Sequence, residues 1–198
     1  MCFSAIVEQD LARLKREFKA KPDLGAFKKL FGRRASGEKI IIPRAMEDNF
    51  RFPAASADEA DIATMVAEHR RKLDLDYREK LKEQQERLAD AQTALARKIT
   101  KTWQNEARIA GNKIRAYEEK IADLPRRTTE RQDNRIFPLH YAPVVIVEKG
   151  ERVIKPMRYL LRRPGDSVKV DDLRNGCYNA LGALLTVRKR QALEFTER

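Results

Sequence analysis

The residue with the clearest potential for chemistry is Cys2, which directly follows Met1. If Met1 is removed, Cys2 becomes the amino terminus, and its thiol and free α-amine lie on adjacent carbon atoms. Such a 1,2-aminothiol condenses with an aldehyde: the amine forms an imine, and the thiol then closes a five-membered thiazolidine ring. A reactive cysteine needs an activating environment, so the alternative is that Cys2 is an ordinary small apolar residue.

The content of cysteine and histidine argues against other kinds of site. Cys2 and Cys177 are the only cysteines, and the first residues do not form a secretory leader, so we expect a reducing compartment and no disulfide framework. His69 and His140 show no metal-ligand spacing, and we therefore expect neither a metal nor a cofactor. No apolar run reaches the roughly 18 residues of a membrane span. These features predict a cytoplasmic protein.

The basic excess of the chain lies in its two flanks. The formal net charge is +12; residues 1–57 contribute 12 Lys/Arg against 7 Asp/Glu, and residues 125–198 contribute 16 against 9. Residues 58–124 hold 14 of each and carry no net charge. This distribution indicates that the flanks meet a polyanion such as nucleic acid, whereas the neutral middle is a poor phosphate binder.

The middle of the sequence has the pattern of a long helix. Residues 58–124 contain no proline and one glycine, and their apolar residues recur at spacings of three, four and seven. The pattern predicts one very long helix, or two antiparallel helices with a break between Thr100 and Gly111. We interpret this segment as an inserted helical hairpin or coiled-coil arm.

Shorter elements are predicted in the flanks. Helices are expected over residues 8–18 and 26–31, and a buried strand is expected over residues 39–42. After Pro125 a polar, basic linker precedes two extended runs, residues 144–147 and 153–161, which the sequence EKGE joins as a hairpin. The last residues have a helical pattern. The expected fold class is α+β, with residues 1–57 and 125–198 forming one body and residues 58–124 inserted between them.

Three separated stretches resemble the SOS response-associated peptidase (SRAP) family of abasic-site processing proteins. They are MCFSA at the start, RIFPLHYAPVVIVEKGERVIKPMRYLLRRPG from residue 135, and NGCYNA from residue 175. The long helical segment resembles an insertion of one subgroup of that family. The resemblance covers most of residues 1–180 and implies a mixed β-sheet body.

The resemblance implies a function in the SOS response to DNA damage. Met1 would be removed autoproteolytically, and Cys2 would form a thiazolidine crosslink with the aldehyde of an abasic site in single-stranded DNA. Asn179 would hydrogen-bond near Cys2 and the deoxyribose, and Arg158, Arg162 and Arg163 are candidate DNA contacts. The expected activities are those of a peptidase and a lyase, and the expected location is the nucleoid region of the cytoplasm.

The sequence also departs from the family pattern. Ser4 and Leu181 stand where many members have DNA-contacting arginines, and the glutamate and histidine expected after Asn179 have no counterpart. We interpret the chain as a truncated or frameshifted member whose catalytic activity is impaired. The alternatives are a non-enzymatic basic helical module that binds nucleic acid or a protein partner through its helices, and a remnant that does not fold stably.

Overall fold

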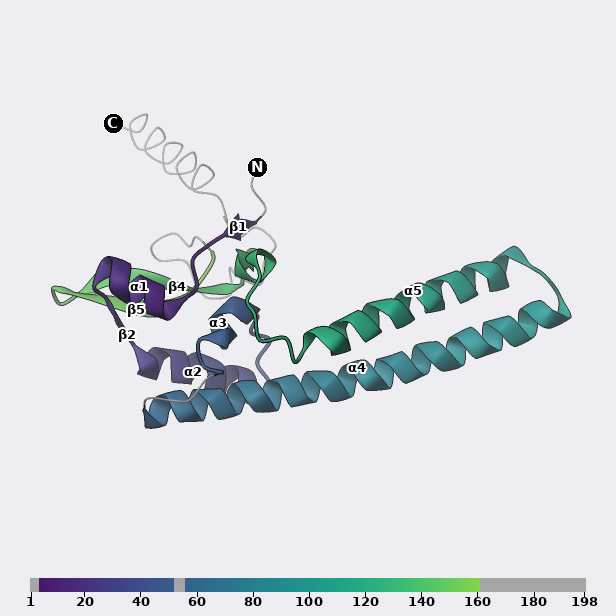
Figure 1. The fold of residues 1–198 in the computed structure, drawn as a ribbon, viewed down its shortest axis with the longest axis horizontal. Helices are drawn as coiled ribbons and strands as arrows, with labels where there is room; N and C mark the ends of the chain where they lie inside the picture. The colour runs from purple at the N-terminus through teal and green to yellow at the C-terminus, as the bar shows by residue number, and fades with distance from the viewer. Residues whose placement is uncertain (1–3, 52–55, 161–198) are drawn as a thin grey trace, which may run out of the picture. The chain divides into compact units, whose positions relative to one another are not determined.

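The computed structural model describes residues 4–51 and 56–160, and the chain divides into two compact units (Figure 1). The first unit comprises residues 1–62 and 130–198, and the second comprises residues 63–129. The first unit combines helices with small sheets and the second is a pair of helices, so the α+β class is confirmed. The helix predicted for the last residues lies outside the described residues.

Side-chain caps fix where the first helices begin. The helices of the first unit are α1 (Leu11–Phe18), α2 (Leu24–Ala35), α3 (Arg44–Asp48) and the 3₁₀ turn η1 (Arg131–Asn134). The Asp10 carboxylate accepts the backbone N–H of Ala12 and of Arg13, so α1 begins three residues later than predicted. Asp23 caps α2 in the same way through the N–H of Ala26, and α2 extends beyond the predicted range on both sides.

Two small sheets join segments that are distant in the sequence. Strand β1 (Ala5–Ile6) pairs antiparallel with β3 (Arg135–Ile136). In the second sheet, the order is β2-β5-β4; β2 (Lys21–Pro22) runs parallel to β5 (Glu151–Arg158), which pairs antiparallel with β4 (Tyr141–Glu148). The predicted hairpin of residues 144–161 is therefore present, with β4 beginning earlier and β5 ending earlier than expected.

The turn of this hairpin consists of two residues in the left-handed region. Lys149 has φ 52° and Gly150 has φ 82°. A two-residue turn with both φ values positive matches the right-handed twist of the flanking strands. Glycine adopts this conformation without the steric cost that a Cβ atom brings, which is why Gly150 suits the second position.

The predicted strand over residues 39–42 is wrong. This segment is extended but belongs to no sheet, and it makes one backbone contact to β4, in which the N–H of Tyr141 donates to the carbonyl of Ile41 at 3.1 Å. Ile40 and Ile42 are buried and Ile41 is exposed, so the side chains alternate as they do in a strand with one buried face. It arises because one side of an extended segment covers the core, and this does not require a hydrogen-bonded ladder.

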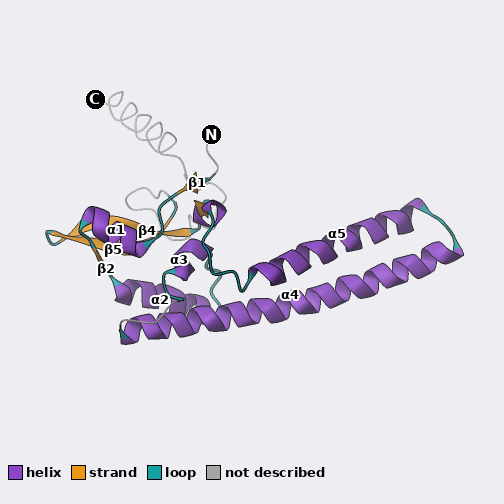
Figure 2. Ribbon diagram, in the orientation of Figure 1, coloured by secondary structure: helices purple, strands orange, loops and turns teal. Residues whose placement is uncertain are grey.

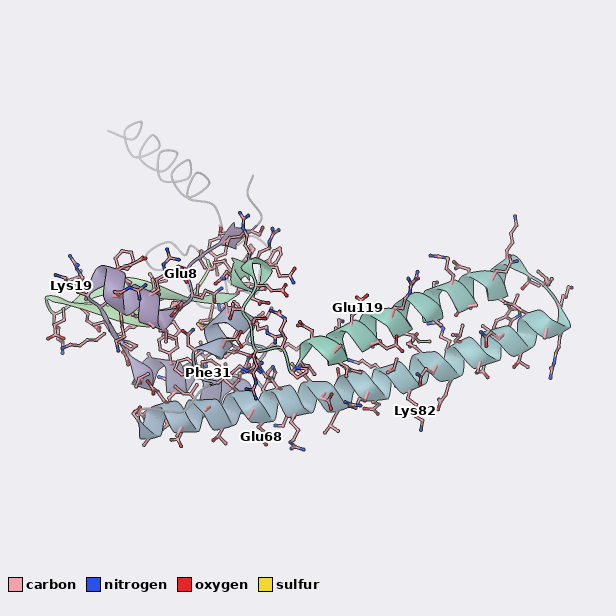
Figure 3. All side chains as sticks on the ribbon, in the orientation of Figure 1. Glu8, Lys19, Phe31, Glu68, Lys82 and Glu119 are labelled. Atoms are coloured by element: carbon pink, nitrogen blue, oxygen red, sulfur yellow. The ribbon has the colours of Figure 1, made fainter. Side chains whose placement is uncertain are left out.

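Aromatic side chains from α2 form the centre of the first unit. Phe27 and Phe31 are fully buried, and the ring centroid of each lies 5.5 Å from that of Phe50. Phe31 is labelled in Figure 3. Met46 from α3 and Ile154 from β5 are also fully buried. The core therefore collects one side chain or more from each of several elements that are far apart in the sequence.

A buried ion pair links α2 to α3. The Arg34 Nη1 lies 2.5 Å from a carboxylate oxygen of Glu47. The exposed fraction of the side chain is 6% for Arg34 and 9% for Glu47. The Arg34 guanidinium also lies 5.1 Å from the ring centroid of Phe31. Removing either charge would leave the other buried, so the pair fixes how α3 docks on α2.

The second unit is a helical hairpin. Helix α4 (Ala57–Arg97) begins in the first unit and supplies most of its length to the second, where α5 (Lys101–Asp123) follows (Figure 2). The predicted helical character of residues 58–124 is confirmed, and residues 62–95 contain no strand. The break lies at residues 98–100, earlier than expected. Thr100 determines it, because its Oγ1 accepts the N–H of Trp103, whereas Gly111 lies inside α5.

Few side chains hold the two helices of the hairpin together. Arg87 on α4 forms an ion pair with Glu106 on α5. The rings of Tyr77 and Tyr117 lie 6.2 Å apart, and the Lys120 ammonium lies within 5.4 Å of both ring centroids. Most apolar residues that recur at spacings of three and four along α4 and α5 remain partly exposed. The hairpin therefore depends on its own helical hydrogen bonds more than on a shared core.

Candidate functional site

Most of the predicted site residues cannot be placed. Cys2, Asn179, Arg162 and Arg163 lie outside the described residues, so the structure does not test whether they come together. Arg158, on β5, is described. The described part of the candidate site is therefore the set of elements that adjoin the MCFSA and RIFPLHYAP stretches.

Strand β1 brings the first two stretches of the resemblance together. Ala5, the last residue of MCFSA, pairs with Ile136, and Ile6 pairs with Arg135. The N–H of Val7 donates to the carbonyl of Asn134 at 3.1 Å and extends this contact by one residue. The backbone just after the N-terminal motif is thus held directly against the start of the second motif.

Asn49 fixes the chain that leads out of β1. Its side-chain amide donates to the carbonyls of Gln9 and Ala45, at 2.8 and 3.0 Å, and its Oδ1 accepts the N–H of Leu11 at 2.7 Å. One side chain therefore hydrogen-bonds backbone groups at the start of α1 and backbone groups of α3. Residues 9–11 are bound to α3 in this way, which limits the directions in which β1 can leave.

An open hollow lies beside β1. It has a volume of about 450 Å³ and is lined by Ile6, Glu130, Arg131, Gln132 and Arg135. The Glu130 carboxylate accepts a hydrogen bond from the Gln132 amide at 2.6 Å. Neither Arg131 nor Arg135 forms an ion pair with any described residue, and both are exposed. Two guanidinium groups without a carboxylate partner are suited to an anionic ligand such as a phosphate.

Arg158 lies in a different environment from the hollow. Its guanidinium is 5.5 Å from the ring centroid of Tyr141, the residue opposite it in the β4–β5 ladder. Hydrogen bonds from Arg33, together with the charges of Arg33 and Arg158, lower the pKa of Glu38. Arg158 is half-buried beside an aromatic ring, whereas Arg131 and Arg135 are exposed.

His140 is a half-buried polar group near the start of β4. Burial lowers the pKa of its imidazole, and its Nδ1 has no hydrogen-bond partner among the described residues. Its ring packs edge-on against Phe137 at 5.4 Å between centroids. A neutral imidazole is therefore favoured at neutral pH, in keeping with a packed side chain.

Sequence reasoning did not identify Arg131 and Arg135 as site residues. They belong to the polar, basic stretch after Pro125, which we interpreted as a linker. Their proximity to Ile6 results from the β1–β3 pairing, in which each strand has only two residues. No local pattern predicts so short a pairing over such a long sequence separation. The only available signal was the basic excess of residues 125–198.

The described residues also bear on metals and membranes. They contain no group of three or more His, Cys, Asp and Glu side chains arranged to hold a metal ion. None of the helices in residues 4–51 and 56–160 combines the length and the apolar character needed to cross a membrane.

Comparison of the chain with protein-family models, with curated proteins and with solved structures finds no match in any of the three.

Proposed function

We propose that this protein recognises abasic sites in single-stranded DNA and binds them covalently through Cys2. The observation that carries the proposal is the pairing of β1 with β3. Two stretches that resemble the same family, about 130 residues apart, lie side by side through Ala5 and Ile136. An arrangement in which the two stretches were remote from each other would have removed their common role.

The chemistry requires only groups that Cys2 carries once Met1 is gone. Hydrolysis of the Met1–Cys2 peptide bond consumes one water and frees the Cys2 amine. The amine attacks the C1′ aldehyde of the ring-opened abasic sugar and forms an imine with loss of water. The thiol sulfur then adds to the imine carbon, its proton passes to nitrogen, and the thiazolidine ring is complete. No oxidant or reductant is needed.

The arginines of the hollow are suited to bind the DNA backbone. Arg131 and Arg135 are exposed, lack carboxylate partners among the described residues and adjoin Ile6. Guanidinium groups bind phosphate through paired hydrogen bonds. We therefore add them to Arg158, Arg162 and Arg163 as DNA contacts. Asn179 keeps its proposed role beside the reacting sugar.

The proposal is tested by incubating the full chain with single-stranded DNA that contains one abasic site. The expected product is an adduct that survives denaturing electrophoresis. The Cys2→Ser variant lacks the thiol, so it should lose the stable adduct while keeping an imine that borohydride traps. A chain verified by mass spectrometry to retain Met1 should form neither product, because its amine lies one residue away.

Matched controls separate this chemistry from general thiol reactivity. The Cys177→Ala variant should react like the unmodified chain, because the Cys177 nitrogen is part of a peptide bond. The Arg131→Ala/Arg135→Ala variant should react more slowly at low DNA concentration and show a weaker salt dependence. Absence of any adduct from a folded chain that lacks Met1 would refute the proposal.

A second candidate function is supported by the charge of the helical unit. Residues 63–129 hold 16 Lys/Arg against 11 Asp/Glu, a net charge of +5. A non-enzymatic module that binds nucleic acid through these helices would keep its affinity for intact DNA in the Cys2→Ser variant and form no adduct in any variant. The same electrophoresis experiment, with a binding measurement on intact DNA, distinguishes the two.

A further inference from the structure

The charge of the helical unit is concentrated in one half of the hairpin. Residues 77–117, from the Tyr77–Tyr117 contact to the turn at residues 98–100, hold ten Lys/Arg against five Asp/Glu. Residues 63–76 and 118–129 hold six of each. Residues 91–105, around the turn, contain Arg97, Lys98 and Lys101 and no acidic residue. The zero net charge of residues 58–124 therefore conceals a basic half of the hairpin.

Part of this charge forms a stripe along α5. Five polar residues follow one another at intervals of four and three, which places them on one face of the helix. All five are exposed: Lys101, Asn105, Arg108, Asn112 and Arg115. We refer to them as the α5 stripe. At a rise of about 1.5 Å per residue, the stripe is about 21 Å long.

The α5 stripe faces away from α4. Glu106, Ala110 and Tyr117, which contact α4 or are buried, lie roughly half a turn around the helix from it. Glu119, labelled in Figure 3, occupies the same face as the stripe four residues beyond Arg115, so the basic character ends there. The stripe therefore begins at Lys101, the first residue of α5, and ends at Arg115.

Hydrogen bonds within the stripe orient its arginines. The Arg108 Nη2 donates to Asn105 Oδ1 at 2.8 Å, and the Arg115 Nη2 donates to Asn112 Oδ1 at 2.7 Å. None of the three basic residues forms an ion pair with a carboxylate in the described part of the chain. Arginine and asparagine are the side chains that most often donate to guanine and adenine edges in the major groove.

We propose that the α5 stripe binds double-stranded DNA, with α5 lying in the major groove. A helix about 10–12 Å in diameter fits a groove about 12 Å wide. Lys101, Arg108 and Arg115 are each separated by two turns, about 10.5 Å, and can reach phosphates on the walls of the groove. Asn105 and Asn112 alternate with them and face the base edges.

The composition of the stripe favours duplex DNA over the two other anionic partners. Proteins that bind single strands combine basic grooves with aromatic side chains on which bases stack, and the stripe has no aromatic residue. Helices that lie on membranes need an apolar face beside the basic one, and the residues that alternate with the basic residues of the stripe are Asn105 and Asn112. The proposal concerns residues other than Cys2 and does not depend on the proposed crosslinking activity.

The test compares two triple variants of the full chain on an intact duplex. Lys101→Ala/Arg108→Ala/Arg115→Ala removes the basic residues of the stripe. Arg71→Ala/Lys72→Ala/Lys82→Ala removes the same charge from exposed positions on α4. Alanine is a strong helix former, so both variants should keep the helical circular dichroism of the unmodified chain. Affinity is measured by fluorescence anisotropy between about 50 and 200 mM salt.

The stripe variant should lose duplex affinity, and the slope of log affinity against log salt should fall by about 0.9 for each phosphate contact removed, or about 2.7 for three. The α4 variant should keep most of the slope. Equal losses in the two variants would overturn the proposal, because the effect would then reflect total charge. The proposal also fails if the stripe variant loses affinity only for a single strand, or only for vesicles with phosphatidylserine.

Discussion

The first unit is organised by a few deeply buried side chains, and the second by contacts along each helix. Phe27, Phe31, Met46 and Ile154 are fully buried in the first unit, whereas the buried residues of the second are Val66, Ala91 and Ala110. Ion pairs at i,i+4, such as Arg78–Asp74 and Lys80–Asp76, follow α4. Each exposed pair contributes only a few tenths of a kcal/mol.

Because of this difference, the two units are suited to different roles. A unit that depends on a shared core fixes the relative positions of distant segments, which is what β1 and β3 require. A long hairpin with little core keeps most of its side chains accessible, and its surface can therefore carry charge without cost to packing. Four measurements, with expected effects of decreasing size, test this comparison.

The Phe31→Ala variant should destabilise the first unit by about 3–5 kcal/mol, because it removes a fully buried aromatic side chain. Hydrogen–deuterium exchange measured by mass spectrometry should show faster exchange in α2 and β5 and little change in α5. Phe18→Ala is the matched control, since Phe18 is 44% exposed and should cost far less. Equal acceleration in both units would show that they share one cooperative core.

The Glu47→Leu variant should destabilise the first unit by about 3 kcal/mol, because it leaves the Arg34 guanidinium buried without its carboxylate. Adding Arg34→Met should recover most of the loss, since an apolar pair of similar volume replaces two buried charges. Chemical denaturation followed by the same exchange measurement checks both. A double variant no more stable than the single would show that the ion pair is needed for packing.

The Thr100→Ala variant should weaken α5 by about 1 kcal/mol, because it removes the cap on the Trp103 N–H. Trp103 is the only tryptophan, so its fluorescence during denaturation reports on the hairpin alone. Thr102→Ala is the control; Thr102 lies inside α5 and the cap does not involve it. A fluorescence transition that moves equally in both variants would contradict the role of the cap.

The smallest effect concerns His140. Burial lowers the pKa of its imidazole in the folded chain, whereas the unfolded chain keeps a value of about 6.5. The unfolded state therefore binds the proton more readily, and stability should fall as the pH drops below about 6.5. The His140→Gln variant should show a shallower loss between pH 7.5 and 5.5 in denaturant titrations. An unchanged profile would mean that other groups cause the pH dependence.

The sequence predicted elements that depend on local interactions and missed those that depend on contacts between distant segments. The long helices were predictable, because their spacing and lack of proline are local features. The β4–β5 hairpin was predictable from its turn. The parallel pairing of β2 with β5 was missed, since Lys21 and Val153 are remote in the sequence. The strand expected at residues 39–42 was wrong, because a short apolar run indicates burial and does not indicate hydrogen bonding within a sheet.

The same distinction between local and long-range features applies to the candidate site. The chemistry of Cys2 could be stated from its position alone, and it remains a prediction. The hollow beside Ile6 could not be anticipated, because Arg131 and Arg135 lie beside Ile6 only through a pairing between the two sequence segments of the first unit. The basic residues of the α5 stripe are offset by acidic residues elsewhere in residues 58–124, so the zero net charge of that segment does not reveal them.

The pairing of β1 with β3 also has a consequence for the order of assembly. Ala5 leaves the ribosome about 130 residues before Ile136, its partner. At about 5–20 residues per second, the N-terminal strand waits roughly 6–26 s during synthesis before that partner exists. Helices α4 and α5 need no such delay, because helices form within about a microsecond of emergence. The strand beside Cys2 is therefore among the last elements that can be placed.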